Sequence, residues 1–416
     1  MSLFFITIYC LLVFFIIYTF VKKLNTYFVI SFLSFLSLYD WLLINLSYYL
    51  PPSFVTLLKC VQEILVVLIS VVFICRIIQK HKFKYNKIDK IVFGFVFLCI
   101  IGVLMSLISG DDISNIITGM RLYIIPILIP YFFYKYGIFN GINYTYIDSF
   151  FKVLILALII YSLIQILTFD GDLSKLWFYK FYDSLKENPV DKASFNFIRN
   201  DRLRATAFFV SSIHMSVISY MISMYFIIRH KKYWLLWTCI SIFGIELSST
   251  RIGYFLLLLS IGIFINEKYL KKHSFFFLIP FSGILFTFLS LVFNITSDES
   301  ALGRLVQYSS FLSNFSVTGR GLGNFFALVF YDSFYISIFI VFGVLGLLYI
   351  FYYCKLINII IDSYNNNKKM MRYSLYISLS ALYMFAFQFV AGTFPFCFLF
   401  FMLFLSFSEL EKDVKV

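Results

Sequence analysis

Charged residues are scarce in this sequence, and no long polar stretch interrupts it. Only 13% of the 416 residues are charged, whereas 61% are hydrophobic. No polar interval exceeds about 40 residues, which is too short for an appended soluble catalytic domain of ordinary size. A composition this apolar is typical of an integral membrane protein. We therefore expect the protein to work within or beside the lipid.

Signatures of metal binding and of nucleophilic catalysis are also missing. The seven cysteines form no CxxC pair, and the four histidines form no HxxxH or HExxH pattern. No Ser-His-Asp or Cys-His arrangement can be read from the sequence. The sequence therefore predicts neither a bound metal nor a cofactor.

The net charge of +13 comes from short basic runs that separate apolar segments. Such runs are typical of cytoplasmic loops, so a nucleic-acid-binding surface is not expected. They alternate with turns that are poor in Lys and Arg, which predicts an outer N-terminus and a cytoplasmic C-terminus. The basic runs are Lys22–Lys23, 76–90, Lys135, 229–232, 268–272 and 368–372.

Apolar runs bounded by charges predict an all-α, polytopic membrane protein with one membrane domain over residues 1–416. An apolar run of about 20 residues can cross a bilayer, which allows about 12–13 transmembrane helices. Two short segments, 252–266 and 395–408, fit half-helices or re-entrant pieces as well as spans. The predicted spans are 3–21, 27–49, 54–75, 91–109, 116–134, 150–168, 205–228, 233–249, 252–266, 274–294, 333–354, 373–391 and 395–408.

Two long polar loops, 169–204 and 295–332, fall on the outer face under this topology. Loops of such length are usually functional or disordered. The first loop ends in Asp201 and Arg204, where the chain enters the next predicted span. An anion at the bilayer surface would meet Arg204 there. Snorkelling, or pairing with Asp201 and its neighbours, explains such an arginine equally well.

Glu246 and Arg251 form a polar island between two apolar runs. A charge near the membrane centre costs roughly 2.5–3.5 kcal/mol, so both side chains are expected to face protein or a water-filled interior. Such residues are functional by default, and the alternative is an ion pair that ties two helices together. Arg121, at the outer start of the fifth predicted span, is a weaker case of the same kind.

The second long loop contains Arg304 and then Gly319, Arg320, Gly321 and Gly323. Glycines at alternate positions let a backbone approach a ligand closely and point N–H groups at it, and Arg320 adds charge. This combination suits a phosphate. A plain glycine turn is the alternative, since the pattern is neither a P-loop nor a dinucleotide-binding fingerprint.

Together these features resemble the bacterial O-antigen polymerase and ligase superfamily, most closely the Wzy-type polysaccharide polymerases. The resemblance covers most of residues 90–410, and it rests on the many spans, the arginine-bearing outer loops, the Thr250-Arg251 pair and the Gly-x-Gly turn at 319–325. The arginine-to-glycine spacing that polymerases often carry in the first outer loop is missing here. Ligases look to a histidine in the late outer loop, and residues 295–332 contain none, which favours a polymerase.

The resemblance implies a multi-pass protein of the bacterial cytoplasmic membrane that joins polyprenyl-diphosphate-linked oligosaccharides by glycosyl transfer on the outer face. Its partners would be that lipid-linked oligosaccharide, membrane lipid, a chain-length regulator and a flippase. Guanidinium groups suit a diphosphate leaving group because they donate bidentately, and no metal is needed. The expected diphosphate clamp consists of Arg121, Arg204, Arg251, Arg304 and Arg320. Asp201, His214 and Glu246 compete for the role of general base.

A flippase or other transporter of the same lipid-linked sugars is the rival hypothesis. Transporters are expected to show repeated halves and polar residues near the midplane of broken helices. No repeat is visible in this sequence, and its polar features gather at one face. Gln62, Glu63 and Gln388, which lie within predicted spans, favour the transporter.

Overall fold

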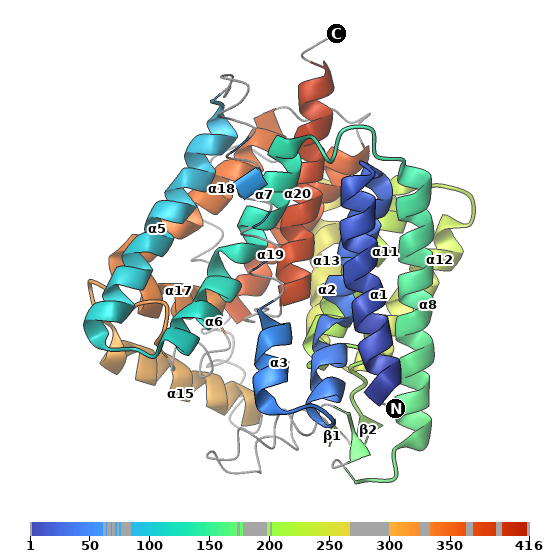
Figure 1. The fold of residues 1–416 in the computed structure, drawn as a ribbon, viewed down its shortest axis with the longest axis horizontal. Coiled ribbons are helices and arrows are strands. Elements are labelled where there is room, and N and C mark those ends of the chain that lie inside the picture. The colour runs from blue at the N-terminus through green and yellow to red at the C-terminus, as the bar shows by residue number, and fades with distance from the viewer. Residues whose placement is uncertain are drawn as a thin grey trace. The chain divides into compact units, whose positions relative to one another are not determined.

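The computed structural model describes most of the chain as helix (Figure 1). The described residues are 2–60, 64, 68, 71–72, 75, 85–172, 175–177, 198–199, 202–266, 299–324, 333–362, 369–387 and 393–413. Within them the strands are β1 (Ile198–Arg199) and β2 (Arg202–Leu203), which pair antiparallel with Arg199 opposite Arg202. Helix is therefore the dominant element of the fold.

The chain divides into two compact units. The first unit comprises Met1–Ile74 and Phe132–Leu258, and the second comprises Cys75–Tyr131 and Leu259–Val416. The first contains α1 (Ser2–Val21), α2 (Asn25–Ser47), α3 (Pro52–Lys59), α8 (Tyr144–Thr168), α11 (Ser212–Arg229) and α12 (Trp234–Ser248). The second contains α5 (Lys87–Ser109), α6 (Ile113–Tyr123), α15 (Glu299–Asn314), α17 (Phe334–Phe342), η4 (Gly343–Leu345), α18 (Gly346–Asp362), α19 (Lys369–Phe387) and α20 (Thr393–Asp413). Helices α7 (Ile125–Tyr136) and α13 (Arg251–Asn266) each have residues in both units.

Six helical segments of the described chain are long and apolar enough to cross a membrane. They confirm the prediction of an all-α, multi-pass membrane protein. These six segments are fewer than the 12–13 predicted spans. Helices α12 and α13 are too short to be counted, and the predicted span 274–294 lies outside the described residues. The six segments are Leu3–Val21, Asn25–Ser47, Lys87–Ser109, Tyr144–Thr168, Ser212–Arg229 and Phe334–Asp362.

Three predicted elements differ from the structure for identifiable reasons. The predicted span 116–134 is the helix pair α6 and α7, bent by 53° at Ile124, just before Pro126, which lacks the N–H that would continue the helix. The predicted span 205–228 begins as helix only at Ser212, after a non-helical segment that contains a turn at Ala207 and Phe208. The second predicted loop contains helix α15, so residues 299–314 are not loop.

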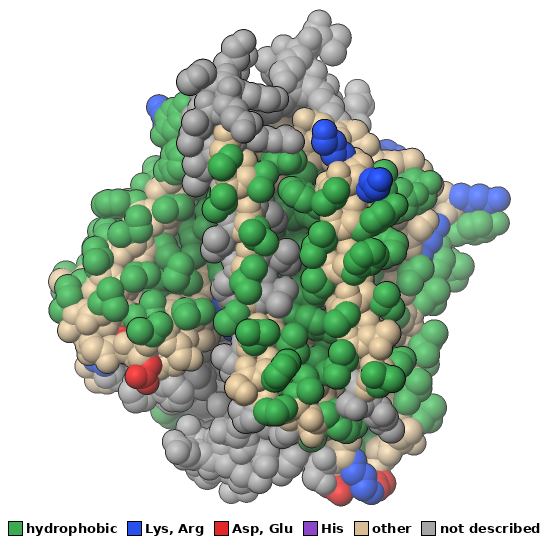
Figure 2. Space-filling view, viewed as in Figure 1, with side chains coloured by type: hydrophobic (Ala, Val, Ile, Leu, Met, Phe, Trp, Pro, Cys, Tyr) green, Lys and Arg blue, Asp and Glu red, His purple; other side chains and the backbone are tan. Residues whose placement is uncertain are grey.

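Hydrophobic side chains cover the surface of the first unit between the ends of its helices. On α1 and α8 they include Phe14, Val21, Val153 and Leu167, each at least 60% exposed. Figure 2 shows green side chains along this face, with charged side chains gathered toward the helix ends. A lipid environment suits such a surface because its exposed side chains are mainly apolar.

Small side chains let α11 approach α12 and the start of α13 closely. A Cβ atom on Gly244 would lie 2.7 Å from the Ser219 Oγ, and a Cβ on Gly253 would lie 2.3 Å from the Ser216 Oγ. Both serines are fully buried. Close approach of helix backbones through glycine and serine is typical of helix pairs in membranes.

The first unit has two chemically distinct ends. At one, the end of α8 lies beside the start of α11, since Gln165 hydrogen-bonds to Ala207. At the other, the start of α8 lies beside the end of α11, since Asp148 forms an ion pair with Arg229. We call the first the arginine end, because Arg204 lies there, and the second the basic end.

Candidate functional site

The candidate residues divide between the two units. Arg204, His214, Glu246 and Arg251 lie in the first, and Arg121, Arg304, Arg320 and the three glycines lie in the second. Asp201 lies outside the described residues. Arg304 lies in α15, but its side chain is outside the described part of the chain.

The Gln165 side chain holds the non-helical segment that connects β2 to α11. Its Oε1 accepts from the backbone N–H groups of Thr206 (3.2 Å) and Ala207 (3.0 Å). Its Nε2 donates to the Ala207 carbonyl (3.3 Å) and to the Thr206 hydroxyl (3.4 Å). Ala207 adopts a left-handed backbone conformation with φ of 49°. One buried amide therefore fixes the backbone immediately after Arg204, whose side chain is only 9% exposed.

Aromatic side chains surround this segment. The Trp177 indole N–H donates to the Ala207 carbonyl (3.1 Å), so the start of the first long loop folds back onto it. The Phe208 ring stacks on Tyr161 at 4.9 Å and meets Trp41 edge-on at 5.6 Å. The Trp41 indole in turn donates to the Tyr161 hydroxyl (3.1 Å). These half-buried rings place flat apolar surfaces close to Arg204 in the chain.

The segment that carries Arg204 also lies against the turn between α12 and α13. The Ala205 N–H donates to the Leu247 carbonyl at 3.1 Å, which places the residues on either side of these two next to each other. The turn itself contains a buried pair of hydroxyls, Ser248 Oγ and Thr250 Oγ1, at 2.9 Å. The structure thus brings together two motifs, around Arg204 and Arg251, that are separated in the sequence.

Glu246 and Arg251 flank this turn at helix ends rather than in mid-helix. Glu246 lies in the last turn of α12, and Arg251 is the first residue of α13. Both side chains are exposed. The Glu246 carboxylate accepts a hydrogen bond from the Tyr254 hydroxyl, one turn into α13. The Glu246 carboxylate and the Arg251 guanidinium therefore both lie at the surface on either side of this turn, where a ligand can contact them.

His214 lies on the first turn of α11, just after the Ser211 side chain that caps this helix. Its side chain is half-buried. The cap explains why the helix begins here, because the Ser211 hydroxyl accepts from the Ile213 N–H that has no partner within the helix. His214 therefore lies at the arginine end, like Glu246, but on α11 instead of α12.

Charges on the described start of the first long loop are paired with each other. Lys175 forms an ion pair with Asp170, and this hydrogen bond holds the pKa of the Asp170 carboxyl below its ordinary value. Arg202 is exposed on β2. Acidic and basic side chains are thus mixed at the arginine end, in contrast to the other end of the unit.

The N–H groups of the glycine loop in the second unit donate hydrogen bonds to neighbouring parts of the protein. Arg320 N donates to the Ile340 carbonyl (2.8 Å) and Gly321 N to the Val341 carbonyl (3.0 Å). Gly323 N donates to the Ser106 hydroxyl (2.7 Å). The prediction that these N–H groups point at a phosphate is therefore wrong, and the plain structural turn is the correct alternative.

The glycines of this loop are required by close contacts. Gly319 and Gly321 have φ of 83° and 93°, the region that favours glycine. A Cβ on Gly321 would lie 2.4 Å from the Ser106 backbone nitrogen. A Cβ on Gly119 of α6 would lie 2.1 Å from the Leu322 carbonyl oxygen. The loop is thus wedged against α5 and α6.

Two predicted clamp residues lie close in the sequence to the contact between Gly119 and the glycine loop. Arg121 lies two residues after Gly119 on α6, and Arg320 lies two residues before Leu322 in the loop that Gly119 contacts. Both arginine side chains are half-buried. The second unit therefore contributes its own pair of guanidinium groups.

Among the residues that the structure describes, no group of three or more His, Cys, Asp or Glu side chains is placed to hold a metal ion. Comparison with protein-family models, with curated proteins and with solved structures finds no match to this chain. The site is therefore characterised by its own geometry.

Gln165 and the aromatic residues around Phe208 are the site residues that sequence reasoning missed. The signal for Gln165 was present, because it is the single amide in the apolar run 150–168, and a buried amide needs partners. The partners themselves lie 41 and 42 residues further along the chain. No periodicity reveals a contact over that separation.

Replacing Gln165 with leucine tests the role of this amide. The Thr206 and Ala207 N–H groups would remain buried without a partner, which costs roughly 1–3 kcal/mol for each group. We expect a clearly lower unfolding temperature in detergent, measured by circular dichroism. The control is Thr168→Val, one turn away, which removes only a local helix hydrogen bond and changes stability by less than about 0.5 kcal/mol. Equal unfolding temperatures of the two variants would contradict the assignment.

Gly321→Ala tests the wedged loop. The added Cβ both clashes with Ser106 and imposes left-handed strain of roughly 1–2 kcal/mol. Gly110→Ala is the matched control, since Gly110 has φ of 75° but nothing within 4 Å of its added Cβ. We expect Gly321→Ala to lower the unfolding temperature distinctly more than Gly110→Ala. If strain alone mattered, the two variants would unfold together.

Proposed function

We propose that this protein is a polysaccharide polymerase, a glycosyltransferase that joins polyprenyl-diphosphate-linked oligosaccharides on the outer face of the bacterial cytoplasmic membrane. The observation that supports the proposal most is the contact between Ala205 and Leu247. It sets a buried arginine beside a hydroxyl turn that ends in a second, exposed arginine. The resemblance of the sequence to the Wzy-type polymerases supports the same function.

The reaction defines what the site must do. The acceptor hydroxyl gives up its proton to a base, its oxygen bonds to the anomeric carbon of the donor, and the bond from that carbon to the diphosphate oxygen breaks. The bonding electrons leave with the polyprenyl diphosphate. Fixed positive charge beside that oxygen stabilises the transition state, and a preorganised group does so without reorganisation. Asp201, His214 and Glu246 are the candidate bases.

Arg204 and Arg251 suit the diphosphate in different ways. Arg204 is buried, and the Gln165 hydrogen bonds fix the backbone that immediately follows it. Arg251 is exposed at the first position of α13, where the positive end of the helix dipole also favours an anion. Arg121, Arg304 and Arg320 are the further candidates for the diphosphate.

The aromatic surfaces near Arg204 suit the sugar part of the substrate. Phe208, Tyr161 and Trp41 form one contiguous cluster of rings, and Trp177 lies against the same segment. Such rings pack against the apolar faces of a ligand while their polar atoms orient it. A site whose arginine segment also carries aromatic rings suits a sugar diphosphate.

The charges at the two ends of the first unit support an outer position for this site. The described segments 19–30, 132–150 and 222–240 at the basic end hold six Lys or Arg residues and one acidic residue. The arginine end mixes Lys175, Arg199, Arg202, Arg204 and Arg251 with Asp170, Asp172 and Glu246, so acidic residues offset more of its positive charge. An excess of Lys and Arg marks the cytoplasmic side of a membrane protein, so the arginine end faces outward.

Thiol labelling tests this orientation. A cysteine is introduced in place of Asp172 or of Lys232 in a background without native cysteines, and intact cells are treated with an impermeant thiol reagent. Both positions are exposed, at opposite ends of the first unit. We expect Asp172→Cys to react in intact cells and Lys232→Cys to react only after the membrane is opened. The reverse pattern would place the site inside and overturn the proposal.

Substitution of the arginines tests the chemistry. In a host lacking the gene, Arg204→Ala, Arg251→Ala and Arg320→Ala are each expected to reduce surface polymer by about 100-fold or more, as for loss of a charge-stabilising donor. Arg251→Lys is expected to recover little, because an ammonium does not donate bidentately. The measurement is a gel of surface glycan, with protein in the membrane quantified by immunoblot.

Arg202→Ala is the matched control, since Arg202 lies two residues from Arg204 but is exposed on β2. It should leave polymer length unchanged. Wild-type polymer in Arg204→Ala and Arg251→Ala would exclude the proposed role. Repeat units trapped on the cytoplasmic face of the deletion strain would instead identify a flippase, and full-length polymer left on its lipid carrier would identify a ligase.

A further inference from the structure

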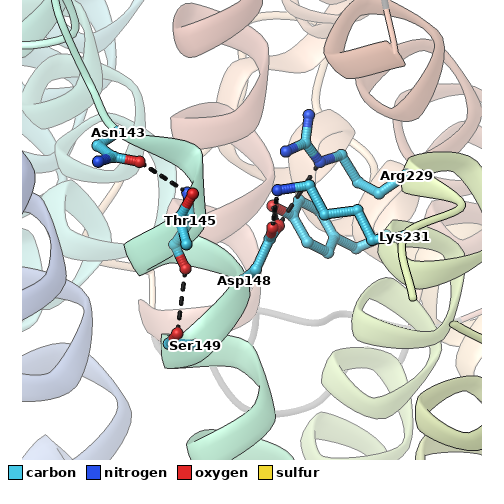
Figure 3. Close-up of polar contacts among 7 residues, drawn as sticks. Asn143, Thr145, Asp148, Ser149, Arg229 and Lys231 are labelled. Carbon is cyan, nitrogen blue, oxygen red and sulfur yellow. Dashed lines mark hydrogen bonds and ion pairs between the residues drawn. The ribbon is translucent and has the colours of Figure 1, made fainter. Parts of the chain in front are cut away.

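A buried carboxylate organises the cations at the basic end of the first unit. Asp148 is 6% exposed and lies in the first turns of α8. Its Oδ2 is 2.6 Å from the Lys231 Nζ, and its Oδ1 is 3.5 Å from the Arg229 Nε. The Tyr225 hydroxyl donates to the same Oδ1. We call these four residues the Asp148 cluster (Figure 3).

The Arg229 guanidinium is held in one orientation. Its Cζ lies 5.1 Å from the centre of the Tyr144 ring and 5.9 Å from that of Tyr225, so it contacts two aromatic faces as well as Asp148. Figure 3 shows its two terminal nitrogens pointing away from Asp148. A guanidinium fixed in this way loses less side-chain entropy when it binds an anion.

The surroundings add positive charge and an apolar surface. Lys22, Lys23 and Lys232 are exposed at this end, and the Thr26 hydroxyl accepts from the Asn143 N–H (3.0 Å), which places the turn between α1 and α2 beside the start of α8. Leu235 and Leu236, on the first turn of α12, are 60% and 55% exposed. Cationic groups therefore adjoin exposed apolar side chains directly.

This combination identifies the class of ligand. A phosphate group suits Arg229 and Lys231, whose two positive charges exceed the single negative charge of Asp148. Exposed leucines beside the cations suit acyl chains, which a free phosphate lacks. Aromatic residues at the same level, with Tyr27 and Tyr146 rings 5.2 Å apart, are typical of the membrane–water interface.

We propose that the basic end of the first unit binds the phosphate headgroup of an anionic phospholipid, with Arg229 and Lys231 as contacts and Asp148 as the residue that positions them. This site lies at the opposite end of the helices from the proposed polymerase site, and it does not depend on that function. It gives the protein a preference for anionic lipid at the surface where the basic residues lie.

Binding of phosphatidylglycerol to the purified full-length protein tests the site. The unfolding temperature is measured in detergent with added phosphatidylglycerol, phosphatidylcholine or inorganic phosphate. We expect phosphatidylglycerol alone to raise it, in a saturable manner. The double variant Lys231→Gln/Lys232→Gln should bind about 30-fold more weakly, from a loss of about fivefold for each lysine near an anionic surface. Arg229→Gln should also lose the shift.

The control variant is Lys175→Gln/Arg202→Gln, which removes the same charge from the arginine end. It should keep the full phosphatidylglycerol shift. Equal shifts from phosphatidylcholine, or an undiminished shift in Lys231→Gln/Lys232→Gln, would overturn the proposal. Equal protection by inorganic phosphate would show a free-anion site instead of a lipid site. The unfolding temperatures in phosphatidylcholine report whether each variant is folded.

Asp148→Asn distinguishes two explanations of phosphatidylglycerol binding: a site in which Asp148 positions Arg229 and Lys231, and a surface that attracts the lipid by its positive charge alone. The variant keeps the side-chain shape but removes one negative charge, so the net charge of the basic end rises by one. A diffuse electrostatic surface would then bind phosphatidylglycerol more tightly. We expect weaker binding, because Arg229 and Lys231 lose the carboxylate that orients them. Tighter binding would show that Asp148 has no positioning role.

Discussion

Buried polar groups in this protein must find their partners within the chain, and this constraint determines how its helices are joined. Hydrocarbon offers no hydrogen bonds, so each polar atom beneath the surface needs a protein partner. Gln165 meets the requirement by binding the segment before α11. Asp148 meets it through Tyr225, Arg229 and Lys231. In the second unit Asp89, which is fully buried, accepts from the Tyr131 hydroxyl (3.0 Å) and closes a capping box with Asn86. Each of these side chains connects elements that are distant in the sequence.

Hydropathy was sufficient to predict most of the long helices, because a span is a local property of composition. The predicted span 150–168 corresponds to α8, and the predicted span 3–21 corresponds to α1. Hydropathy failed where a hydrogen bond outweighed it. Residues 205–211 are apolar enough to continue α11, yet Gln165 holds Thr206 and Ala207 in a non-helical turn. A bend at Ile124 likewise follows from the covalent structure of Pro126 rather than from the hydropathy of its neighbours.

The candidate site was predictable as a set of residue types but not as an arrangement. The sequence singled out Arg204 and Arg251, and the contact of Ala205 with Leu247 that places their segments together depends on tertiary packing. The glycine loop shows the converse. Its pattern predicted N–H groups that point at a ligand, but in the structure they point into the protein toward α5 and α17.

The serine and glycine contacts of α11 have a mechanical consequence. Ser216 occupies the space that a side chain at Gly253 would need, and Ser219 occupies the space that a side chain at Gly244 would need. Helix α11 therefore interlocks with α12 and with α13 at two points along its length. A helix that interlocks with its neighbours at two points resists both sliding along them and rotation about its own axis. Helix α11 begins beside the segment of Arg204 and ends at Arg229. A rigid α11 therefore keeps the distance between the arginine end and the basic end constant. Lateral pressure in the bilayer would move this group of helices as one piece.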